Sequence, residues 1–343
     1  MSGGVPAPGP GALRGTGVPG AAPADEDRPA VPESPQPRQG TGSRFAAWAE
    51  LLRLPALFTV PGDLLAGSAT APGRPGTRVL WAIGSSLCLY EAGMALNDWA
   101  DRAEDAVERP HRPLPSGRIR PAAALTAACA LTATGLALAA RSGRPALAVA
   151  APLAATVWAY DLGLKRTPAG PAAMATARAL DLLLGAAATS GRVRPALPSA
   201  ALLGTHTLAL TAVSRHETEG GAPLAPLTAL ATTGVLTRLL SRRLARDQLP
   251  LSRGKLCSFR SASLATLPAA CALAYAATAA RPYLHATLNP SPPLTQRAVG
   301  GGIRATIPLQ AALCARSSAP VSAVITAALA PLAARFAKKV SVT

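Results

Sequence analysis

From residue 45 onward, the chain is a succession of Ala- and Leu-rich stretches separated by short runs rich in Arg, Pro and Gly. A helix needs about 20 mainly apolar residues to cross the hydrocarbon core of a bilayer. Stretches of that order occur at residues 46–70, 79–97, 121–140, 144–160, 171–190, 197–213, 223–241, 261–280 and 300–336, and the last is long enough for two helices. The sequence therefore predicts an all-α, polytopic membrane protein.

The alternative, a large soluble helical bundle, requires polar outer helix faces, which these stretches lack. Charged residues make up only 15% of the chain, against about 25% in an average soluble protein. The net charge of +17, from 34 Lys and Arg against 17 Asp and Glu, therefore reflects a shortage of acids. It differs from the Lys-rich polar surface of a nucleic-acid-binding protein, so we expect no nucleic acid partner.

Residues 1–44 differ from the rest of the chain because they are dense in Pro and Gly and show no apolar periodicity. Such a stretch cannot bury enough apolar surface to offset its ordering entropy, and it lacks the basic start and apolar core of a cleavable secretion signal. We therefore expect a disordered tail at 1–44 and a membrane domain at 45–343. The five Cys are scattered and odd in number, which predicts neither a zinc site nor a disulfide framework.

Five of the 17 acidic residues crowd into residues 98–108, directly after the second apolar segment. If the helix continues, Asn97, Asp101 and Asp105 follow one another at i, i+4 positions on one face, with Asp98 one turn from Asp101. Like charges at that spacing repel each other, so helix stability does not favour them, whereas a hard divalent cation does. Because Mg²⁺ is usually shared between one or two carboxylates and substrate phosphates, the cluster points to a diphosphate substrate.

A basic, proline-rich run follows the acidic cluster and reads Arg109-Pro110-His111-Arg112-Pro113-Leu114-Pro115-Ser116-Gly117. Arg109 and Arg112 can fork onto phosphate oxygens that the metal leaves free. The alternative is a solvated polar loop whose arginines hold lipid headgroups at the membrane surface. We favour the phosphate site, because the acidic and basic signals lie next to each other.

These residues resemble the UbiA superfamily of intramembrane aromatic prenyltransferases, whose first motif, NDxxDxxxD, is followed by RPxRPxPSG. The first motif is matched by Asn97, Asp98, Asp101 and Asp105, and the second run by Arg109 to Gly117. The resemblance extends to Arg53-Leu54-Pro55 with Gly67 in the first apolar segment, and to Tyr160-Asp161, Lys165, Gly170-Pro171 and Arg178 around the fourth and fifth. It covers most of residues 45 to about 320.

The family's second acidic motif, typically DxxxD between helices six and seven, is degenerate in this chain. The corresponding residues are Ser214-Arg215-His216-Glu217-Thr218-Glu219-Gly220-Gly221. Glu217 and Glu219 still offer carboxylate oxygens, but the regular Asp pair is absent. We therefore expect one strong metal cluster aided by Arg215, in a divergent branch of the family.

The resemblance implies a ring of about nine transmembrane helices around a central cavity, with both acidic motifs facing the cytoplasm. It also implies Mg²⁺-dependent transfer of an isoprenyl group from a prenyl diphosphate to an acceptor, often an aromatic one. The implied partners are the prenyl diphosphate donor, a small-molecule acceptor and membrane lipids. We expect an integral, multi-pass protein of a bacterial cell membrane, although the Arg and Lys counts of alternate loops do not decide its orientation.

Each candidate residue receives a role from this resemblance. Binding of Mg²⁺ and diphosphate is assigned to Asn97, Asp98, Asp101 and Asp105, and binding of a second cation to Glu217 and Glu219. Pairing with the diphosphate is assigned to Arg109, Arg112, Lys165, Arg178 and Arg215, and substrate binding to Asp161. The Tyr160 ring can face a carbocation, an interaction of about 0.5–2 kcal/mol, or it is an ordinary interfacial tyrosine.

Other polar residues lie within or near the apolar segments. The acids Asp63, Glu91 and Asp181 are functional candidates on that ground and could line the acceptor pocket. The alternative is that they reach the interface or pair with a buried Arg. His206 is alone in its segment, so a hydrogen bond between helices is expected rather than a ligand role.

Two other functions compete with prenyl transfer: a polytopic transporter that binds a cation at the acidic cluster, and a scaffold that binds prenyl lipids without turnover. Transporters place charged sites near the bilayer midplane on broken helices, whereas this cluster lies at a helix end beside a basic loop. The scaffold function remains an alternative because the second motif is degenerate.

Overall fold

The computed structural model describes residues 41–73, 75–247 and 259–340 of the 343-residue chain. Every regular element in these ranges is a helix, and the ranges contain no strand. The predicted all-α class is therefore confirmed. The described residues belong to one compact unit, Gly40–Thr343. The predicted tail lies almost entirely outside the described residues, and the first described helix begins at Thr41.

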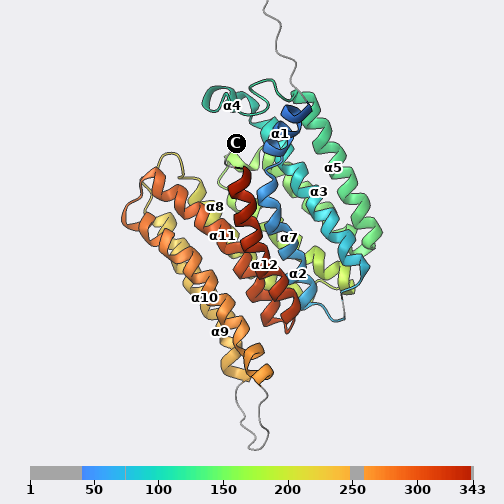
Figure 1. The fold of residues 1–343 in the computed structure, drawn as a ribbon, viewed down its shortest axis with the longest axis vertical. Coiled ribbons are helices and arrows are strands. Elements are labelled where there is room, and N and C mark those ends of the chain that lie inside the picture. The colour runs from blue at the N-terminus through green and yellow to red at the C-terminus, as the bar shows by residue number, and fades with distance from the viewer. Residues whose placement is uncertain (1–40, 74, 248–258, 341–343) are drawn as a thin grey trace, which may run out of the picture. The chain divides into compact units, whose positions relative to one another are not determined.

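The helices follow one another along the chain and run mostly up and down beside their neighbours (Figure 1). In order they are α1 (Thr41–Leu51), the 3-10 helix η1 (Leu54–Thr59), α2 (Val60–Thr70), α3 (Thr77–Ala100), α4 (Arg102–Glu108), α5 (Pro121–Ser142), α6 (Arg144–Leu162), η2 (Leu164–Arg166), α7 (Gly170–Ser190), η3 (Arg194–Ala196), α8 (Leu197–Ser214), α9 (Leu224–Asp247), α10 (Phe259–Leu288), α11 (Pro292–Arg316) and α12 (Pro320–Val340). The long apolar stretch 300–336 is thus divided between α11 and α12, as its length allows.

Proline and glycine mark where these helices start and stop. Pro121, Pro171 and Pro198 stand in the first turn of α5, α7 and α8, where no N–H is needed and the fixed φ suits a helix. Gly191 follows α7 in the left-handed region, with a φ of 71°, which costs glycine little. The short runs rich in Pro and Gly in the sequence are therefore helix boundaries.

Six helices in the described part of the chain are long and apolar enough to cross a membrane, judged by length and composition. They lie in Thr77–Ala100, Pro121–Ser142, Arg144–Leu162, Gly170–Ser190, Arg194–Ser214 and Leu224–Ser241. The chain is accordingly an integral, multi-pass membrane protein. The expected number of about nine transmembrane helices stays a prediction.

Helices α2 and α7 cross closely because each presents a glycine to the other. A Cβ atom on Gly67 would overlap the backbone oxygen of Leu182, and a Cβ atom on Gly185 would overlap the backbone of Leu64. In lipid, such small residues let helix backbones approach and gain packing contacts. The crossing fixes how α2 lies against α7, and both helices contribute side chains to the site described below.

His206 of α8 joins α8 to two later helices. Its ring nitrogens lie 3.1 Å from the Tyr275 hydroxyl of α10 and 3.2 Å from the Gly302 carbonyl oxygen of α11. The expected hydrogen bond between helices is confirmed. Both ring nitrogens have a partner, so His206 serves the packing of the bundle.

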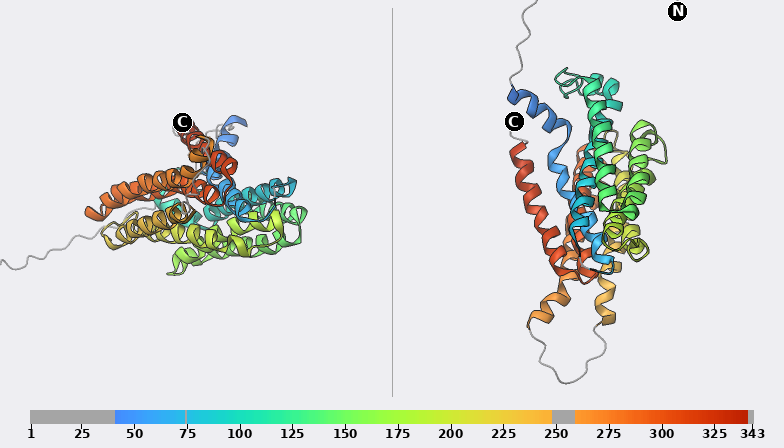
Figure 2. Two further views of the ribbon diagram at one scale, coloured as in Figure 1. Left: turned by 90° about the horizontal axis from the view of Figure 1, so that it is seen from below. Right: turned by 90° about the vertical axis from the view of Figure 1, so that its right-hand side faces the viewer.

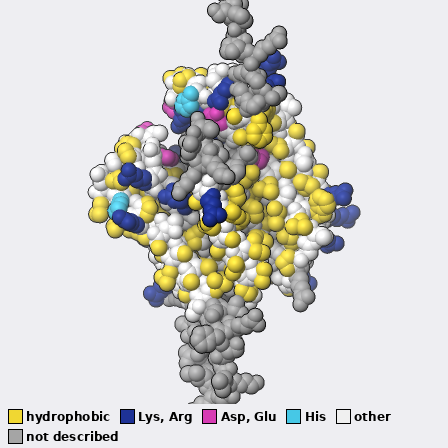
Figure 3. All heavy atoms as spheres, viewed as in Figure 1, with side chains coloured by type: hydrophobic (Ala, Val, Ile, Leu, Met, Phe, Trp, Pro, Cys, Tyr) yellow, Lys and Arg dark blue, Asp and Glu magenta, His cyan; other side chains and the backbone are white. Residues whose placement is uncertain are grey.

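The acidic side chains gather toward one end of the helices. The first turns of α1 and all of α4 lie at this end, and the end of α9 with the start of α10 lies at the other (Figures 1 and 2). On the face shown in Figure 3, hydrophobic side chains cover much of the surface, and the visible Asp and Glu side chains lie in its upper part. The carboxylates visible on this face therefore lie toward the end that carries α4.

The α2–α7 crossing should be intolerant of any side chain at its two glycines. We expect Gly67→Ala to lower the thermal midpoint of the detergent-purified protein by several degrees, because overpacking costs about 1–3 kcal/mol. The matched control is Gly234→Ala in α9, where an added Cβ would meet nothing within 4 Å. That control should be neutral or slightly stabilising, and equal destabilisation by both variants would contradict the close crossing.

Candidate active site

The first acidic motif lies where α3 ends. This helix stops at Ala100, Asp101 has a φ of −89° and a ψ of 3°, and α4 starts at Arg102. The predicted uninterrupted helix is therefore interrupted at Asp101. Backbone hydrogen bonds from Asp101 N–H to the Asn97 oxygen and from Asp105 N–H to the Asp101 oxygen nevertheless keep the i, i+4 spacing across the interruption. Like charges at this spacing repel each other, so each carboxylate needs a basic partner.

Asp98 and Asp105 share one arginine. Arg112 Nη1 lies 2.7 Å from Asp105 Oδ2 and 3.8 Å from Asp98 Oδ1. Both carboxylate side chains are buried, with 4% and 6% of their surface exposed. Arg53 Nη2 lies 3.1 Å from Asp98 Oδ1, and Arg109 Nη1 lies 3.5 Å from Asp105 Oδ1. Two buried carboxylates thus converge on a single cationic nitrogen.

Asp101 pairs with two other cations. Lys165 Nζ lies 2.8 Å from Asp101 Oδ1 and donates to Asn97 Oδ1 at 3.1 Å. Arg166 Nη2 lies 3.0 Å from the same oxygen of Asp101. Lys165 is also 4.0 Å from Asp161, which precedes it by four residues. The connection between α6 and α7 therefore lies against the acidic end of α3.

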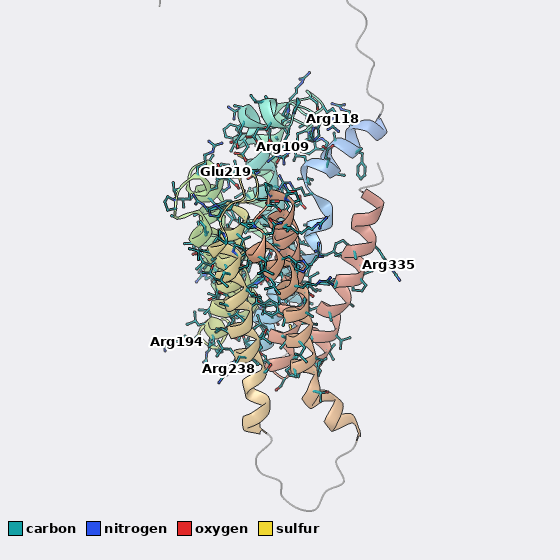
Figure 4. All side chains as sticks on the ribbon, turned by 90° about the vertical axis from the view of Figure 1, so that its left-hand side faces the viewer. Arg109, Arg118, Arg194, Glu219, Arg238 and Arg335 are labelled. Atoms are coloured by element: carbon teal, nitrogen blue, oxygen red, sulfur yellow. The ribbon has the colours of Figure 1, made fainter. Side chains whose placement is uncertain are left out.

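The loop between α8 and α9, which carries the degenerate second motif, lies at the same end. Glu219 and Arg109 are both at this end, whereas Arg194 and Arg238 are at the other (Figure 4). Arg215 donates to the carbonyl oxygen of Thr167, which ties the loop to the α6–α7 connection.

The two glutamates of this loop differ in their surroundings. Glu217 is half-buried, and this burial raises the pKa of its carboxyl, while the Arg109 guanidinium partly offsets the rise. Glu219 is exposed. Arg109 therefore lies within electrostatic reach of both motifs.

A cavity of about 240 Å³ lies between α3, α6 and α7, next to the acidic motif. Its walls are mostly apolar. At the end near the motif it is lined by Arg53, Asn97, Tyr160 and Asp161, and along its length by Leu89, Tyr90, Gly93, Met94, Leu153, Val157, Met174 and Ala177. An elongated apolar molecule with a charged head can therefore place its head at the motif and its body in the cavity.

The far end of this cavity is polar and is lined by Ser86, Arg178 and Asp181. Arg178 Nη2 lies 3.0 Å from Oδ2 of the fully buried Asp63. Ser86 Oγ donates to Asp181 Oδ1 at 2.5 Å, and Gln310 Nε2 donates to Asp63 Oδ1 at 2.6 Å. Arg178, which the sequence assigns to the diphosphate, thus has its ion pair in this deeper network. Asp63 therefore has the Arg partner that the sequence allows for it, whereas Asp181 is paired with the Ser86 hydroxyl.

The acidic end has the donor type that suits Mg²⁺, which prefers oxygen ligands. Among the described residues, no three His, Cys, Asp or Glu side chains lie close enough to hold a metal ion by themselves. Asp98 and Asp105 nevertheless face one cationic nitrogen, so two carboxylates can face one cation there. These residues fit a cation that is shared with substrate phosphates and do not form a closed metal cage.

Two basic residues of this end received no site role from the sequence, although Arg53 belongs to the resemblance in the first apolar segment. Arg53 contacts Asp98 from a position between α1 and η1 where its φ is 49°, a conformation that strains a residue with a side chain. Arg166 contacts Asp101. The available signals are weak: Arg53 follows an apolar helix directly, and Arg166 forms a basic doublet with Lys165.

The chain matches the model of one protein family. Residues 56–288 match the model of the UbiA prenyltransferase family. The digeranylgeranylglyceryl phosphate synthase of Methanopyrus kandleri is 36% identical over 127 residues, which is 36% of this chain and 45% of that protein. The protoheme IX farnesyltransferase of Acidiphilium cryptum is 34% identical over 160 residues, which is 44% of this chain and 50% of that protein. The chain thus matches about half the length of these relatives.

The fold also has solved counterparts. The structure of a UbiA homolog from Archaeoglobus fulgidus bound to GPP and Mg²⁺ superposes with a TM-score of 0.55 at 15% identity, covering 80% of this chain and 99% of that one. The apo structure of a UbiA homolog from Aeropyrum pernix gives a TM-score of 0.53 at 18% identity, covering 72% and 96%. At such low identity, these matches establish a common fold.

The raised pKa of Glu217 predicts a pH-dependent stability difference. A carboxyl whose pKa is higher in the folded than in the unfolded state stabilises the fold at low pH, and this contribution is lost as the pH rises through the folded-state pKa. Glu217→Gln removes that loss, so its thermal midpoint relative to the parent protein should rise as the pH increases above the ordinary carboxyl range. The matched control is Glu219→Gln at the exposed neighbour, and a Glu217→Gln profile that does not differ from that of the control would refute the burial of Glu217.

Proposed function

The chain belongs to the UbiA prenyltransferase family, and on that premise we propose that it transfers an isoprenyl group from a prenyl diphosphate to an acceptor within the membrane. The observation that carries the proposal is the convergence of buried carboxylates and basic side chains at one end of an apolar cavity. A prenyl diphosphate has the same two parts, an anionic head and a hydrocarbon tail.

The basic residues of the acidic end bind the head of the donor. Arg112 and Lys165 each contact a motif carboxylate, and each can turn its positive charge to phosphate oxygens once a cation neutralises those carboxylates. Arg109 lies between the two motifs and offers a forked guanidinium for the same oxygens. Arg53 contacts Asp98 and lines the cavity, so it lies where the head meets the tail.

Asn97, Asp98, Asp101 and Asp105 hold Mg²⁺ in this proposal. Bound Mg²⁺ would supply positive charge against the negative charge that develops on the departing diphosphate. The Archaeoglobus fulgidus homolog was solved with GPP and Mg²⁺, which supports the choice of metal and donor. Glu217 and Glu219 are weaker candidates for a second cation, with Arg215 beside them.

The cavity keeps water away from the carbon that loses the diphosphate. Its walls are mainly Leu, Val, Met and Ala side chains, which exclude water and hold the hydrocarbon tail. Tyr160 lines the cavity at the end near the motif, where its ring can stabilise positive charge on the prenyl carbon by about 0.5–2 kcal/mol. Asp161 lies beside it and is the closest cavity-lining acid to Lys165.

Membership of the family does not identify the acceptor. The names of the matched relatives, digeranylgeranylglyceryl phosphate synthase and protoheme IX farnesyltransferase, refer to unlike products. The expected acceptor is a small molecule, aromatic or lipid. The cytoplasmic placement of the acidic end and the bacterial cell membrane remain part of this proposal.

Prenyl transfer accounts for the site better than the two competing functions. A cation transporter places its cation site near the middle of the membrane, whereas the acidic motif lies at the end of α3 beside α4. The deeper Asp63 is already paired with Arg178. A scaffold without turnover would keep donor binding and lose catalysis. The experiment below separates these cases.

Purified protein should release diphosphate from geranyl diphosphate in the presence of an acceptor extract, and only with Mg²⁺. Asp101→Asn should lower the rate by on the order of 100-fold or more, because the variant loses a carboxylate that would hold Mg²⁺ against the departing diphosphate. Diphosphate release measured by a coupled assay checks this.

The matched control is Glu108→Gln, which removes an exposed carboxylate from the same acidic cluster and should leave the rate near the parent value. Turnover that persists without a divalent metal, or that survives Asp101→Asn, would sink the mechanism. Tight Mg²⁺-dependent donor binding with no turnover in the parent protein would instead identify a scaffold.

The second motif should matter less than the first. We expect the double variant Glu217→Gln, Glu219→Gln to change the KM for geranyl diphosphate by less than about fivefold, because partly exposed charges contribute about 1 kcal/mol or less. Asp98→Asn, at the buried pair, should have a far larger effect in the same assay. A loss in the double variant as large as that in Asp98→Asn would show that the second motif binds a full metal ion.

A further inference from the structure

A polar network, formed by Ser86, Arg178 and Asp181 with Asp63 behind them, lies at the end of the cavity away from the acidic motif. Ser86 precedes Asn97 by eleven residues on α3, so the two lie about 16 Å apart along the helix at 1.5 Å per residue. Three side chains of this network line the cavity itself. We call Ser86, Arg178 and Asp181 the cavity floor.

A hydrocarbon tail cannot satisfy the floor. Isoprenyl chains carry no hydrogen-bonding group, and burying polar groups against hydrocarbon without partners costs free energy. The walls between the motif and the floor are apolar and suit such a tail or a ring. A group that forms hydrogen bonds with the floor must therefore be polar, which the prenyl tail is not.

The charges of the floor exclude an anion. Arg178 is the one cation among these groups, and it already pairs with Asp63 at 3.0 Å. Asp181 adds a second carboxyl, which accepts a hydrogen bond from Ser86. Two carboxyl groups against one guanidinium leave no surplus positive charge, so a phosphate or carboxylate would meet repulsion at Asp181.

The hydrogen-bonding pattern of the floor suits a hydroxyl group. Asp181 offers oxygens that accept a hydrogen bond, and the Arg178 guanidinium has five N–H donors, of which Asp63 engages only part. A hydroxyl donates to the first and accepts from the second. A carboxylate can only accept, and an apolar end can do neither.

Resting on the proposed function, we propose that Ser86, Arg178 and Asp181 form the subsite for the far end of the acceptor, and that this end is an uncharged hydroxyl group of an alcohol or a phenol. Arg178 is then a positioning residue for the acceptor rather than a ligand of the diphosphate. The acceptor is elongated, because its reacting atom must approach the acidic motif while its hydroxyl reaches the floor.

The test measures binding without Mg²⁺ or a prenyl donor. Purified protein in nanodiscs is titrated with para-hexylphenol, para-hexylbenzoate and hexylbenzene, which differ only at one end. We expect the phenol to bind at least about tenfold more tightly than either of the others, because a site built for a hydrogen-bonding group rejects analogues that leave its partners unpaired.

Two variants test whether the charge of the network causes the preference for phenol over benzoate. Asp181→Asn removes the charge that repels an anion, so the preference for phenol over benzoate should fall at least about tenfold. Asp63 belongs to the same network but does not line the cavity. Asp63→Asn also removes a negative charge, so it should lower the preference for phenol over benzoate in the same way. It keeps the test valid if the first variant fails to fold.

The matched control is Glu91→Gln. Glu91 is a buried carboxyl on α3 that does not line the cavity and has no hydrogen-bond partner among the described residues. This variant should leave the preference unchanged, which excludes a general effect of neutralising a buried acid.

Benzoate binding as tight as phenol binding, equal binding of phenol and hexylbenzene, or no phenol binding would each overturn the subsite. So would an unchanged preference in both Asp variants. These outcomes are separable from the proposed function, because diphosphate release needs donor and Mg²⁺ and the binding test uses neither. Release with no phenol preference would reject the subsite alone, and phenol preference with no release would reject prenyl transfer alone.

Discussion

The structure depends on how a chain with few acids neutralises the carboxylates that it buries. Asp98 and Asp105 lose nearly all contact with water, and an unpaired carboxylate in such surroundings costs several kcal/mol. Arg53 before η1 and Arg109 and Arg112 after α4 meet this demand. Lys165, between α6 and α7, pairs in the same way with the neighbouring Asp101. The same ion pairs that permit burial bring the loops together and so assemble the site.

The helices and the first motif could be predicted from the sequence, because apolar length and acidic spacing are local signals. The break at Asp101 could not, since a continuous helix and a broken one have the same residue pattern until partners such as Lys165 are known. Arg53 and Arg166 were missed for a related reason. A lone arginine carries no sign of its partner, and the partner of Arg53 lies 45 positions away.

The depth of Arg178 was also beyond the sequence. Its resemblance to a family position assigns it to the diphosphate, but the acid with which it pairs depends on how α2 lies against α7. Gly67 and Gly185 set that contact and so bring Asp63 within 3.0 Å of Arg178. Two glycines without functional groups thereby decide which acid an arginine meets.

One helix, α3, carries both polar limits of the cavity, with Asn97 at the motif and Ser86 at the floor. Their separation is a property of a single rigid element and does not change when neighbouring helices shift. The lengths of both substrates are therefore compared with the same distance along α3. A substrate that is one isoprene unit or one ring too long cannot be accommodated by a shift of the neighbouring helices, so the backbone of α3 selects substrates by length.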